Sequence, residues 1–297
     1  MSYLVYDVGG TFIKYANMQA NGTIMHQGKV PTPRDTQVHF IQVLKEVFEK
    51  EVDIQGVALS LPGTIDTEKG LVLQGGSLQY NNRCHMKELL EKELGVTVEL
   101  ENDARCACLA ELWKGNLKGI RNGAVLTFGT GIGGAFVLDG KLYKGSHFFS
   151  GEVSMLLTKD FTEYGIHGIW GSEGSVPKLI KKISEAKKFA PQTGEVVFNW
   201  IKEGDETACA MFEAYCKRMS YPMFNLQLIL DPARICIGGG ISENPVFIEG
   251  IQKAMKRFYE QLPIKMPQLE IVPCAFHNDS NLLGALYHYQ MMRGEAE

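Results

Sequence analysis

The chain has 297 residues, of which 45% are hydrophobic and 22% are charged, a balance typical of a folded globular protein rather than a disordered one. No apolar run approaches the ~20 residues that span a bilayer, and a net charge of −4 argues against a basic nucleic-acid-binding surface. The seven cysteines have no C-x-x-C spacing, so we expect reduced thiols rather than disulfides or a zinc ribbon. The N-terminus enters an apolar strand without a leader-like segment, which favours a cytoplasmic location.

The first part of the chain alternates strands and helices. Apolar runs separated by turn signals predict strands over 3–8, 12–18, 24–30, 55–61 and 96–101. Apolar residues at helical spacing predict helices over 37–50, 86–94 and 104–113. This alternation is typical of an α/β protein.

The second part of the chain is richer in helix. Predicted strands span 124–128, 135–138, 233–237 and 269–272. Predicted helices span 177–190, 194–202, 207–230, 247–262 and 281–292. Between the two parts, residues 114–122 have the composition of a connector, which predicts a lobe boundary there.

A glycine hairpin pattern occurs twice. Gly10-Thr11 and Gly129-Thr130 each follow an apolar strand, and a hairpin turn follows each at a similar distance, at Asn21-Gly22 and at Asp139-Gly140. One supersecondary unit used twice would give this pattern, although a single sequence leaves duplication and coincidence both open.

The first glycine loop, Gly9-Gly10-Thr11, lies between two predicted strands, with Asp7 before it and Lys14 after it. Adjacent glycines let backbone N–H groups approach a phosphate without Cβ obstruction, and Thr11 adds a hydroxyl donor. Asp7 could hold a metal-bound water beside the phosphates. Taken alone, the loop also fits an ordinary hairpin turn.

Two further glycine clusters lie later in the chain. Residues 129–134 match G-x-G-x-x-G, but a strand and the Asp139-Gly140 turn follow instead of a helix. We therefore reject a dinucleotide-binding fingerprint and predict a backbone phosphate cradle. Residues 238–240, three glycines after a strand, could let a purine or ribose lie close to the backbone, although a mobile turn explains them equally.

Polar residues after other strands are candidates for acid–base chemistry. Asp103 follows Glu101-Asn102 and opens a helix, so it is a natural N-cap, a structural role that needs no function. In the functional interpretation, Asp103 accepts a proton from a substrate hydroxyl and Asn102 binds a sugar diol. The loop Pro62-Gly63 and the carboxylate of Glu152 also suit polyol binding, although each also reads as an ordinary loop or a solvated carboxylate.

The ordered set of two glycine hairpins, an Asn-Asp pair and a late triple glycine resembles the actin-like ATPase superfamily, and specifically the ROK family of sugar kinases. The resemblance runs from Asp7 to at least Gly240. It implies an α/β fold of two actin-like (ribonuclease H-like) lobes, over 1–117 and 118–297, with the active site in the cleft between them. It also implies that the closing helix, about 281–295, packs back onto the first lobe.

The resemblance further implies roles for the residues singled out above. Asp103 would be the catalytic base and Asp7 would lie near Mg²⁺, which it holds through water. Sugar-binding positions would be Asn102, Glu152, Pro62, Gly63 and Glu173. Nucleotide-binding positions would be Asp7, Gly9, Gly10, Thr11, Lys14, Thr130, Gly131, Gly133, Gly134, Gly238, Gly239 and Gly240.

One departure from the family pattern concerns zinc. Many members follow the Gly-Glu pair with Gly-His and a cysteine-rich zinc knot, but here Met155 stands at the histidine position. The stretch 164–174 has no cysteine, so we predict no zinc site. This zinc-free pattern is similar to that of bacterial β-glucoside kinases and glucokinases.

The resemblance implies transfer of the γ-phosphoryl group of ATP to a sugar hydroxyl, with O6 of a hexose or β-glucoside as the expected acceptor. The alternatives are an N-acetylmannosamine kinase or fructokinase of the same family, a non-catalytic sugar sensor and an unrelated actin-like ATPase. Only six residues precede Asp7, so we expect no helix-turn-helix like that of the family's repressors. We expect a small-molecule sugar substrate, a homodimer, and no nucleic-acid or membrane partner.

Overall fold

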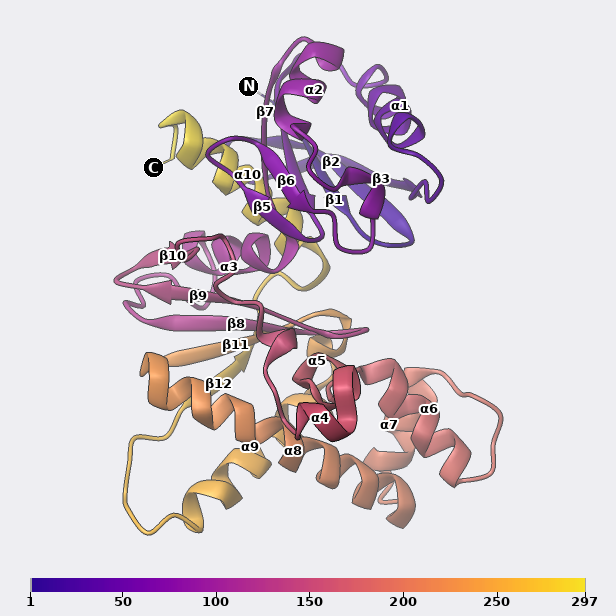
Figure 1. The fold of residues 1–297 in the computed structure, drawn as a ribbon, viewed down its shortest axis with the longest axis vertical. Helices are drawn as coiled ribbons and strands as arrows, with labels where there is room; N and C mark the ends of the chain where they lie inside the picture. Colours follow the sequence, from indigo (N-terminus) through magenta and orange to yellow (C-terminus); the bar gives the residue numbers. More distant parts are fainter. Residues whose placement is uncertain (1, 297) are drawn as a thin grey trace. The chain divides into compact units, whose positions relative to one another are not determined.

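The computed structural model describes residues 2–296, which divide into two compact units (Figure 1). Of these residues, unit 1 takes 2–118, 144–150 and 279–296, and unit 2 takes 119–143 and 151–278. The closing helix and the short segment Lys144–Ser150 therefore belong to unit 1. Among residues 2–296, no helix combines the length and the apolar composition needed to cross a membrane.

The main sheet of unit 1 has five strands, which are β1 (Ser2–Val8), β2 (Phe12–Gln19), β3 (Ile24–Pro31), β4 (Ile54–Leu61) and β7 (Thr97–Asn102). Their order is β3-β2-β1-β4-β7, with β1 antiparallel to β2 and parallel to β4. Gly22 closes the β2–β3 hairpin with φ 83°, a left-handed conformation that favours glycine. A second small sheet, β5 (Thr64–Asp66) and β6 (Leu71–Gln74), was not predicted because its strands are too short to show alternation.

The helices of unit 1 are α1 (Gln37–Phe48), η1 (Gln79–Asn81), α2 (Met86–Leu94), α3 (Asp103–Trp113) and α10 (Ser280–Arg293). Leu4 and Tyr6 of β1 are fully buried in one apolar cluster with Leu44 of α1 and Leu90 of α2. Helix α10 packs against α3 and the main sheet. A Cβ on Gly284 of α10 would overlap the backbone of α3, so glycine permits this close helix packing.

The sheet of unit 2 repeats this topology. Its strands are β8 (Gly123–Phe128), β9 (Ile132–Leu138), β10 (Lys141–Tyr143), β11 (Arg234–Gly238) and β12 (Glu270–Pro273). Their order is β10-β9-β8-β11-β12, in which an antiparallel hairpin precedes parallel strands, as in unit 1. The repeated unit that the sequence suggested is therefore present as two sheets of one topology.

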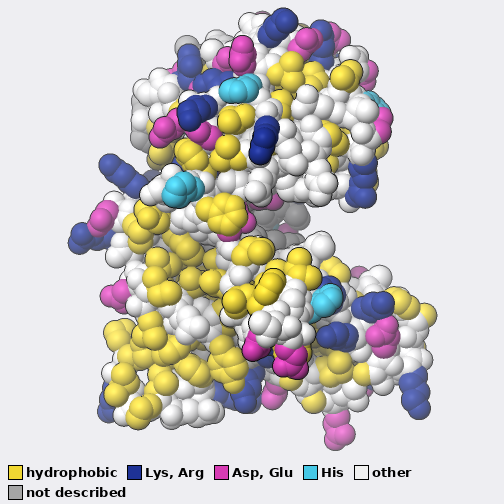
Figure 2. Space-filling view, in the orientation of Figure 1, with side chains coloured by type: hydrophobic (Ala, Val, Ile, Leu, Met, Phe, Trp, Pro, Cys, Tyr) yellow, Lys and Arg dark blue, Asp and Glu magenta, His cyan; other side chains and the backbone are white. Residues whose placement is uncertain are grey.

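The helices of unit 2 are η2 (Val153–Met155), α4 (Phe161–Tyr164), η3 (Gly165–Gly168), α5 (Trp170–Glu173), α6 (Val176–Ala186), α7 (Gly194–Lys202), α8 (Glu206–Leu230), η4 (Gly240–Glu243) and α9 (Pro245–Glu260). A last short helix, η5 (His277–Asp279), precedes α10. The core of unit 2 is rich in aromatic rings, and Phe128 and Phe247 lie at its centre with ring centroids 5.3 Å apart. Figure 2 shows charged side chains spread over unit 1 and hydrophobic side chains gathered on one face of unit 2.

Candidate active site

The first glycine loop turns its carbonyl groups toward the protein. Thr32 Oγ1 donates to the carbonyl of Gly9 over 2.7 Å, and Arg34 Nη2 donates to the carbonyl of Gly10 over 2.6 Å. Among the described residues, the backbone N–H groups of Gly10 and Thr11 have no hydrogen-bond partner. The loop therefore offers two backbone donors to an anion, as a phosphate cradle requires.

Asp7 lies at the end of β1, beside this loop. Its Oδ1 accepts hydrogen bonds from Ser60 Oγ over 3.0 Å and from Asn281 Nδ2 over 2.9 Å, and within residues 2–296 no hydrogen bond reaches its Oδ2. Burial raises the pKa of the Asp7 carboxyl, while the Asn281 bond, the Lys14 charge and the Ser60 bond oppose that shift. One carboxylate oxygen held in place and one left open fit an outer ligand of a hydrated Mg²⁺ ion.

Asn102 and Asp103 begin helix α3. The N-cap is Asn102, whose Oδ1 accepts the N–H of Arg105 over 3.2 Å. The expectation that Asp103 is the N-cap is therefore wrong. Asn102 has the extended backbone that a cap needs, which places Asp103 in the first helical turn. There Asp103 Oδ1 accepts from Ala104 N over 2.7 Å, at the helix end where the dipole favours a carboxylate.

The predicted sugar-side loop joins this helix start. Gly63 has φ 102°, and its carbonyl accepts a hydrogen bond from Asn102 Nδ2 over 2.9 Å. The same Nδ2 donates to Asp103 Oδ1 over 3.0 Å. Unit 1 thus brings together three residues that the sequence placed at the sugar: Gly63, Asn102 and Asp103.

A buried group of charged side chains lies next to Asn102. Glu101 is fully buried, and its Oε1 accepts the N–H of Asn102 over 2.8 Å. Lys144 Nζ lies 2.7 Å from Glu101 Oε2, and Arg105 Nη1 lies 3.6 Å from Oε1. Burial alone would raise the pKa of Glu101, but charge interactions with His288 in its protonated form, with Lys144 and with Arg105 hold it below its usual value.

The ring of His288 belongs to the same buried group. Its Nδ1 lies 3.9 Å from Glu101 Oε2, and burial lowers the pKa of His288 to about 4. His288 is therefore neutral at pH 7, and Lys144 and Arg105 carry the charges that balance Glu101.

These charges fasten the segment Lys144–Ser150 to unit 1. Arg105 Nη2 donates to the carbonyl of Phe148 over 2.7 Å and to that of Ser150 over 3.3 Å. Lys144 Nζ also donates to Thr67 Oγ1 over 2.7 Å. The segment that leads directly into Gly151-Glu152 is thus held by the residues beside the predicted base.

In unit 2, the second and third glycine clusters lie side by side. Gly239 has φ 85°, and a Cβ there would overlap the carbonyl of Phe128. Only glycine permits this approach, which places residues 238–240 against the start of the 129–134 cluster. Within residues 2–296, the N–H groups of Thr130 and Gly131 have no hydrogen-bond partner, so this loop also offers backbone donors.

Both clusters line one cavity of about 740 Å³ in unit 2. Its apolar wall includes Phe128, Ile180 and Phe198, and its rim carries Asn199 and Lys202. The remaining lining residues are Gly129, Thr130, Val176, Pro177, Gly194, Glu195, Gly240, Ile241, Glu243, Asn244, Pro245 and Val246. An apolar cavity with polar residues in its lining, together with the N–H group of Thr130, which is unpaired within residues 2–296, suits a purine nucleotide.

Gly151, the residue before the predicted sugar-side Glu152, lies against the second glycine cluster. Gly133 and Gly134 are strand residues of β9 rather than loop residues, because the pairing with β8 extends to Ile132. A Cβ on Gly134 would come within 2.9 Å of the carbonyl of Gly151. Gly151 therefore packs directly on β9, and Glu152 follows it in the chain.

Comparison with known proteins assigns the family. The model of the ROK family matches residues 3–291. The chain belongs to the ROK family. The predicted family and the predicted actin-like α/β fold are thus confirmed.

Individual ROK proteins resemble the chain over nearly its whole length. A β-glucoside kinase from Klebsiella pneumoniae is 29% identical, over 98% of this chain and 97% of the relative. A solved ROK family protein from Streptococcus pneumoniae, in complex with sucrose, has a TM-score of 0.89 at 28% identity and covers 99% of this chain and 100% of its own. The ROK hexokinase from Thermus thermophilus shares the fold, with a TM-score of 0.80 at 24% identity over 99% of this chain and 100% of its own. These names agree with the predicted enzyme class, a carbohydrate kinase.

Several bonds join residues of the stretch that the resemblance aligns with the family's zinc knot. Lys159 Nζ lies 2.7 Å from Glu173 Oε1, and Thr158 donates to the carbonyl of Gly168 from both N and Oγ1. Met155 is 54% exposed. Among residues 2–296, no three His, Cys, Asp or Glu side chains gather as a metal site. The carboxylate of Glu173 is thus engaged by a lysine in this structure, and its role at the sugar stays a prediction.

Several residues around the site were missed from sequence. Ser60, Asn281 and Arg105 come from β4, α10 and α3, and Lys144 comes from the segment after β10. They meet Asp7 or Glu101 only after folding. No local pattern marks them. The one available signal was Glu101, a charged residue at the end of an apolar strand, where burial demands a partner.

Proposed function

We propose that the chain is an ATP-dependent sugar kinase that transfers the γ-phosphoryl group to a sugar hydroxyl, O6 of a hexose or a β-glucoside. The observation that carries the proposal is that Gly129, Thr130 and Gly240 line one and the same cavity of unit 2. Its apolar wall would take the adenosine, and the donors of Thr130 would meet the phosphates. ATP is supplied in the cytoplasm, where we place the enzyme.

The first glycine loop, in unit 1, would also bind phosphate. The open N–H groups of Gly10 and Thr11 would bind the transferred phosphoryl group. Asp7 would hold Mg²⁺ through water with its open oxygen, while Ser60 and Asn281 fix its orientation. When bound, Mg²⁺ supplies positive charge that balances the phosphates.

Asp103 would act as the general base. As the sugar oxygen forms its bond to the γ-phosphorus, the bond from that phosphorus to the β,γ-bridging oxygen breaks, and the hydroxyl proton passes to Asp103. Asn102 donates to Asp103 Oδ1 and so fixes the carboxylate for this transfer. The chemistry needs little more than positioning and charge stabilisation.

Gly63, Asn102 and Glu152 would bind the sugar, with Glu173 as a second carboxylate. The β-glucoside kinase name of the Klebsiella relative and the sucrose bound to the Streptococcus neighbour support a glucose-containing substrate. Hydroxyl groups need donors and acceptors together, which Asn102 provides in one side chain.

An ADP-release assay with glucose, N-acetylmannosamine, fructose and β-glucosides tests the proposal. We expect ADP release only when a sugar is present, and a product phosphorylated at O6 by NMR. ADP release at the same rate without sugar would indicate an unrelated ATPase. Sugar binding by calorimetry without any turnover would indicate a sensor.

A further inference from the structure

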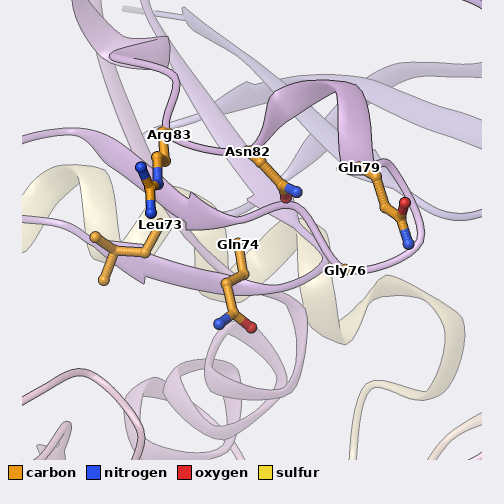
Figure 3. Close-up of a pocket in the computed structure, with 6 residues that line it drawn as sticks. All are labelled: Leu73, Gln74, Gly76, Gln79, Asn82 and Arg83. Carbon is orange, nitrogen blue, oxygen red and sulfur yellow. The ribbon is translucent and has the colours of Figure 1, made fainter.

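We propose that a second pocket, in unit 1, binds the second sugar ring of a disaccharide β-glucoside. The pocket has a volume of about 390 Å³ and is lined by Leu73, Gln74, Gly76, Gln79, Asn82 and Arg83 (Figure 3). This inference rests on the proposed sugar-kinase function and names its substrate class. The volume lies at the small end of the ~300–1,000 Å³ range of ligand pockets, a size that suits one ring.

The wall of the pocket packs against the loop of the proposed sugar site. A Cβ on Gly63 would overlap the carbonyl of Gln74 and would come within 2.8 Å of Gly76 N. The wall of the pocket and the sugar-side loop are therefore packed backbone to backbone. The carbonyl of Gly63 accepts a hydrogen bond from Asn102, the residue before Asp103. A substrate that extends from the base past Gly63 would enter this pocket.

The pocket is formed before any ligand binds. Gly75 N donates to Asn82 Oδ1 over 2.7 Å, and Val72 N donates to the carbonyl of Cys84 over 2.9 Å. Tyr80 of η1 donates to the carbonyl of Pro33 over 2.7 Å and anchors the loop. These bonds fix the loop before binding, so the loop would lose little conformational entropy when a ligand binds.

One residue of this loop has a strained backbone. Arg83 has φ 56°, a left-handed conformation that costs free energy for a residue other than glycine. Strain of this kind persists only where the surrounding structure imposes it, and it is common at binding sites. In Figure 3 the Arg83 side chain extends toward the end of β6, where Leu73 and Gln74 lie.

The lining groups match a hydroxylated ring. Among residues 2–296, the side chains of Gln74, Gln79 and Arg83 make no hydrogen bond or ion pair with the protein. Two amides that both donate and accept, next to a guanidinium that donates, suit adjacent sugar hydroxyls. Leu73 is the one large apolar side chain in the lining, so an aromatic aglycone would find little apolar surface.

The test compares a disaccharide with a monosaccharide on the intact chain. The steady-state kinetics of cellobiose, glucose and phenyl β-glucoside would be measured for the wild type, Gln79→Ala and Arg83→Ala. We expect kcat/KM for cellobiose to fall at least about fivefold in each variant, while that for glucose falls less than about twofold. The control Arg218→Ala, an exposed arginine of α8 in unit 2, should leave the cellobiose-to-glucose ratio unchanged.

The outcomes separate this inference from the proposed function. Equal losses for glucose and cellobiose, no loss for cellobiose, or a selective loss for phenyl β-glucoside would each overturn the second-sugar subsite. A wild type that phosphorylates glucose but not cellobiose would overturn it too, with the kinase intact. If the wild type phosphorylates no sugar, the proposed function fails, and calorimetric binding of cellobiose to the wild type and Arg83→Ala then decides the pocket. Equal affinities, or no binding, would refute it.

Discussion

The two five-stranded sheets share one strand order but present different groups where their strands end. In unit 1, the carboxyl ends of the parallel strands β1, β4 and β7 carry polar side chains, namely Asp7, Ser60 and Asn102. The corresponding strands β8 and β11 of unit 2 end in Phe128 and Gly238. Phe128 lines the apolar cavity, and Gly238 begins the glycine turn beside it. We infer that both glycine hairpins supply backbone donors to phosphate, and that neighbouring side chains decide which part of the reaction each unit handles.

The buried charges of unit 1 give the largest contrast, since the core of unit 2 is mainly apolar and aromatic. Glu101→Gln leaves Lys144 and Arg105 without a counter-charge, so we expect the free energy of unfolding to fall by about 3–5 kcal/mol. Urea denaturation of the variant measures this loss.

The control for that variant is an exposed ion pair. Glu93→Gln removes the partner of Lys45, 3.1 Å away on the surface of unit 1, and we expect a loss below about 1 kcal/mol. A Glu101→Gln loss no larger than that of Glu93→Gln would show that the buried charges do not hold unit 1 together.

A pH effect should also be specific to unit 1. His288 titrates near 4 in the folded chain and near 6.5 when unfolded, so the unfolded chain binds more protons between these values and stability falls as the pH falls. Between pH 7 and pH 5 we expect a loss of about 2 kcal/mol. His288→Gln should remove this loss in urea denaturation at the two pH values.

The matched control for His288 is His85→Gln, an exposed histidine of unit 1, which should keep the wild-type pH dependence. The window lies above the range in which Glu101 would titrate, because the pKa of Glu101 is lowered. A His288→Gln variant that loses as much stability at pH 5 as the wild type would contradict the assignment.

The smallest predicted effect tests whether the two glycine hairpins are equivalent. A Cβ on Gly10 would meet no chain atom nearer than 3.7 Å, and one on Gly129 would meet none within 4 Å, so Gly10→Ala and Gly129→Ala should fold normally. If each loop binds phosphate through its backbone, each variant should raise the KM for ATP about tenfold. An unchanged melting temperature with an unchanged KM in either variant would remove that loop from the site.

Local signals were enough to predict most of the fold. Hydrophobic periodicity and turn residues predicted α2 at Met86–Leu94 and α7 at Gly194–Lys202, which are the bounds in the structure. The three-residue strands β5 and β10 were missed because so few residues carry no periodic signal. The helix predicted over 177–190 ends earlier, at Ala186, since Lys188 has φ 61° and cannot continue a helix.

The site was predictable only where its residues carry a local motif. Asn102 and Asp103 were found as a pair, but the choice of N-cap was wrong because both residue types cap helices well and only the backbone separates them. Asn281 and Lys144 reach Asp7 and Glu101 from remote parts of the chain, so their roles depend on tertiary packing that no short pattern encodes.

The most direct test of the proposed division of labour is Asp103→Asn, with turnover and nucleotide binding measured on the same preparation. If Asp103 accepts the hydroxyl proton while unit 2 binds the nucleotide, kcat should fall at least ~10²-fold, and the calorimetric affinity for a non-hydrolysable ATP analogue should stay within about twofold. Near-normal turnover in the variant would contradict the base assignment.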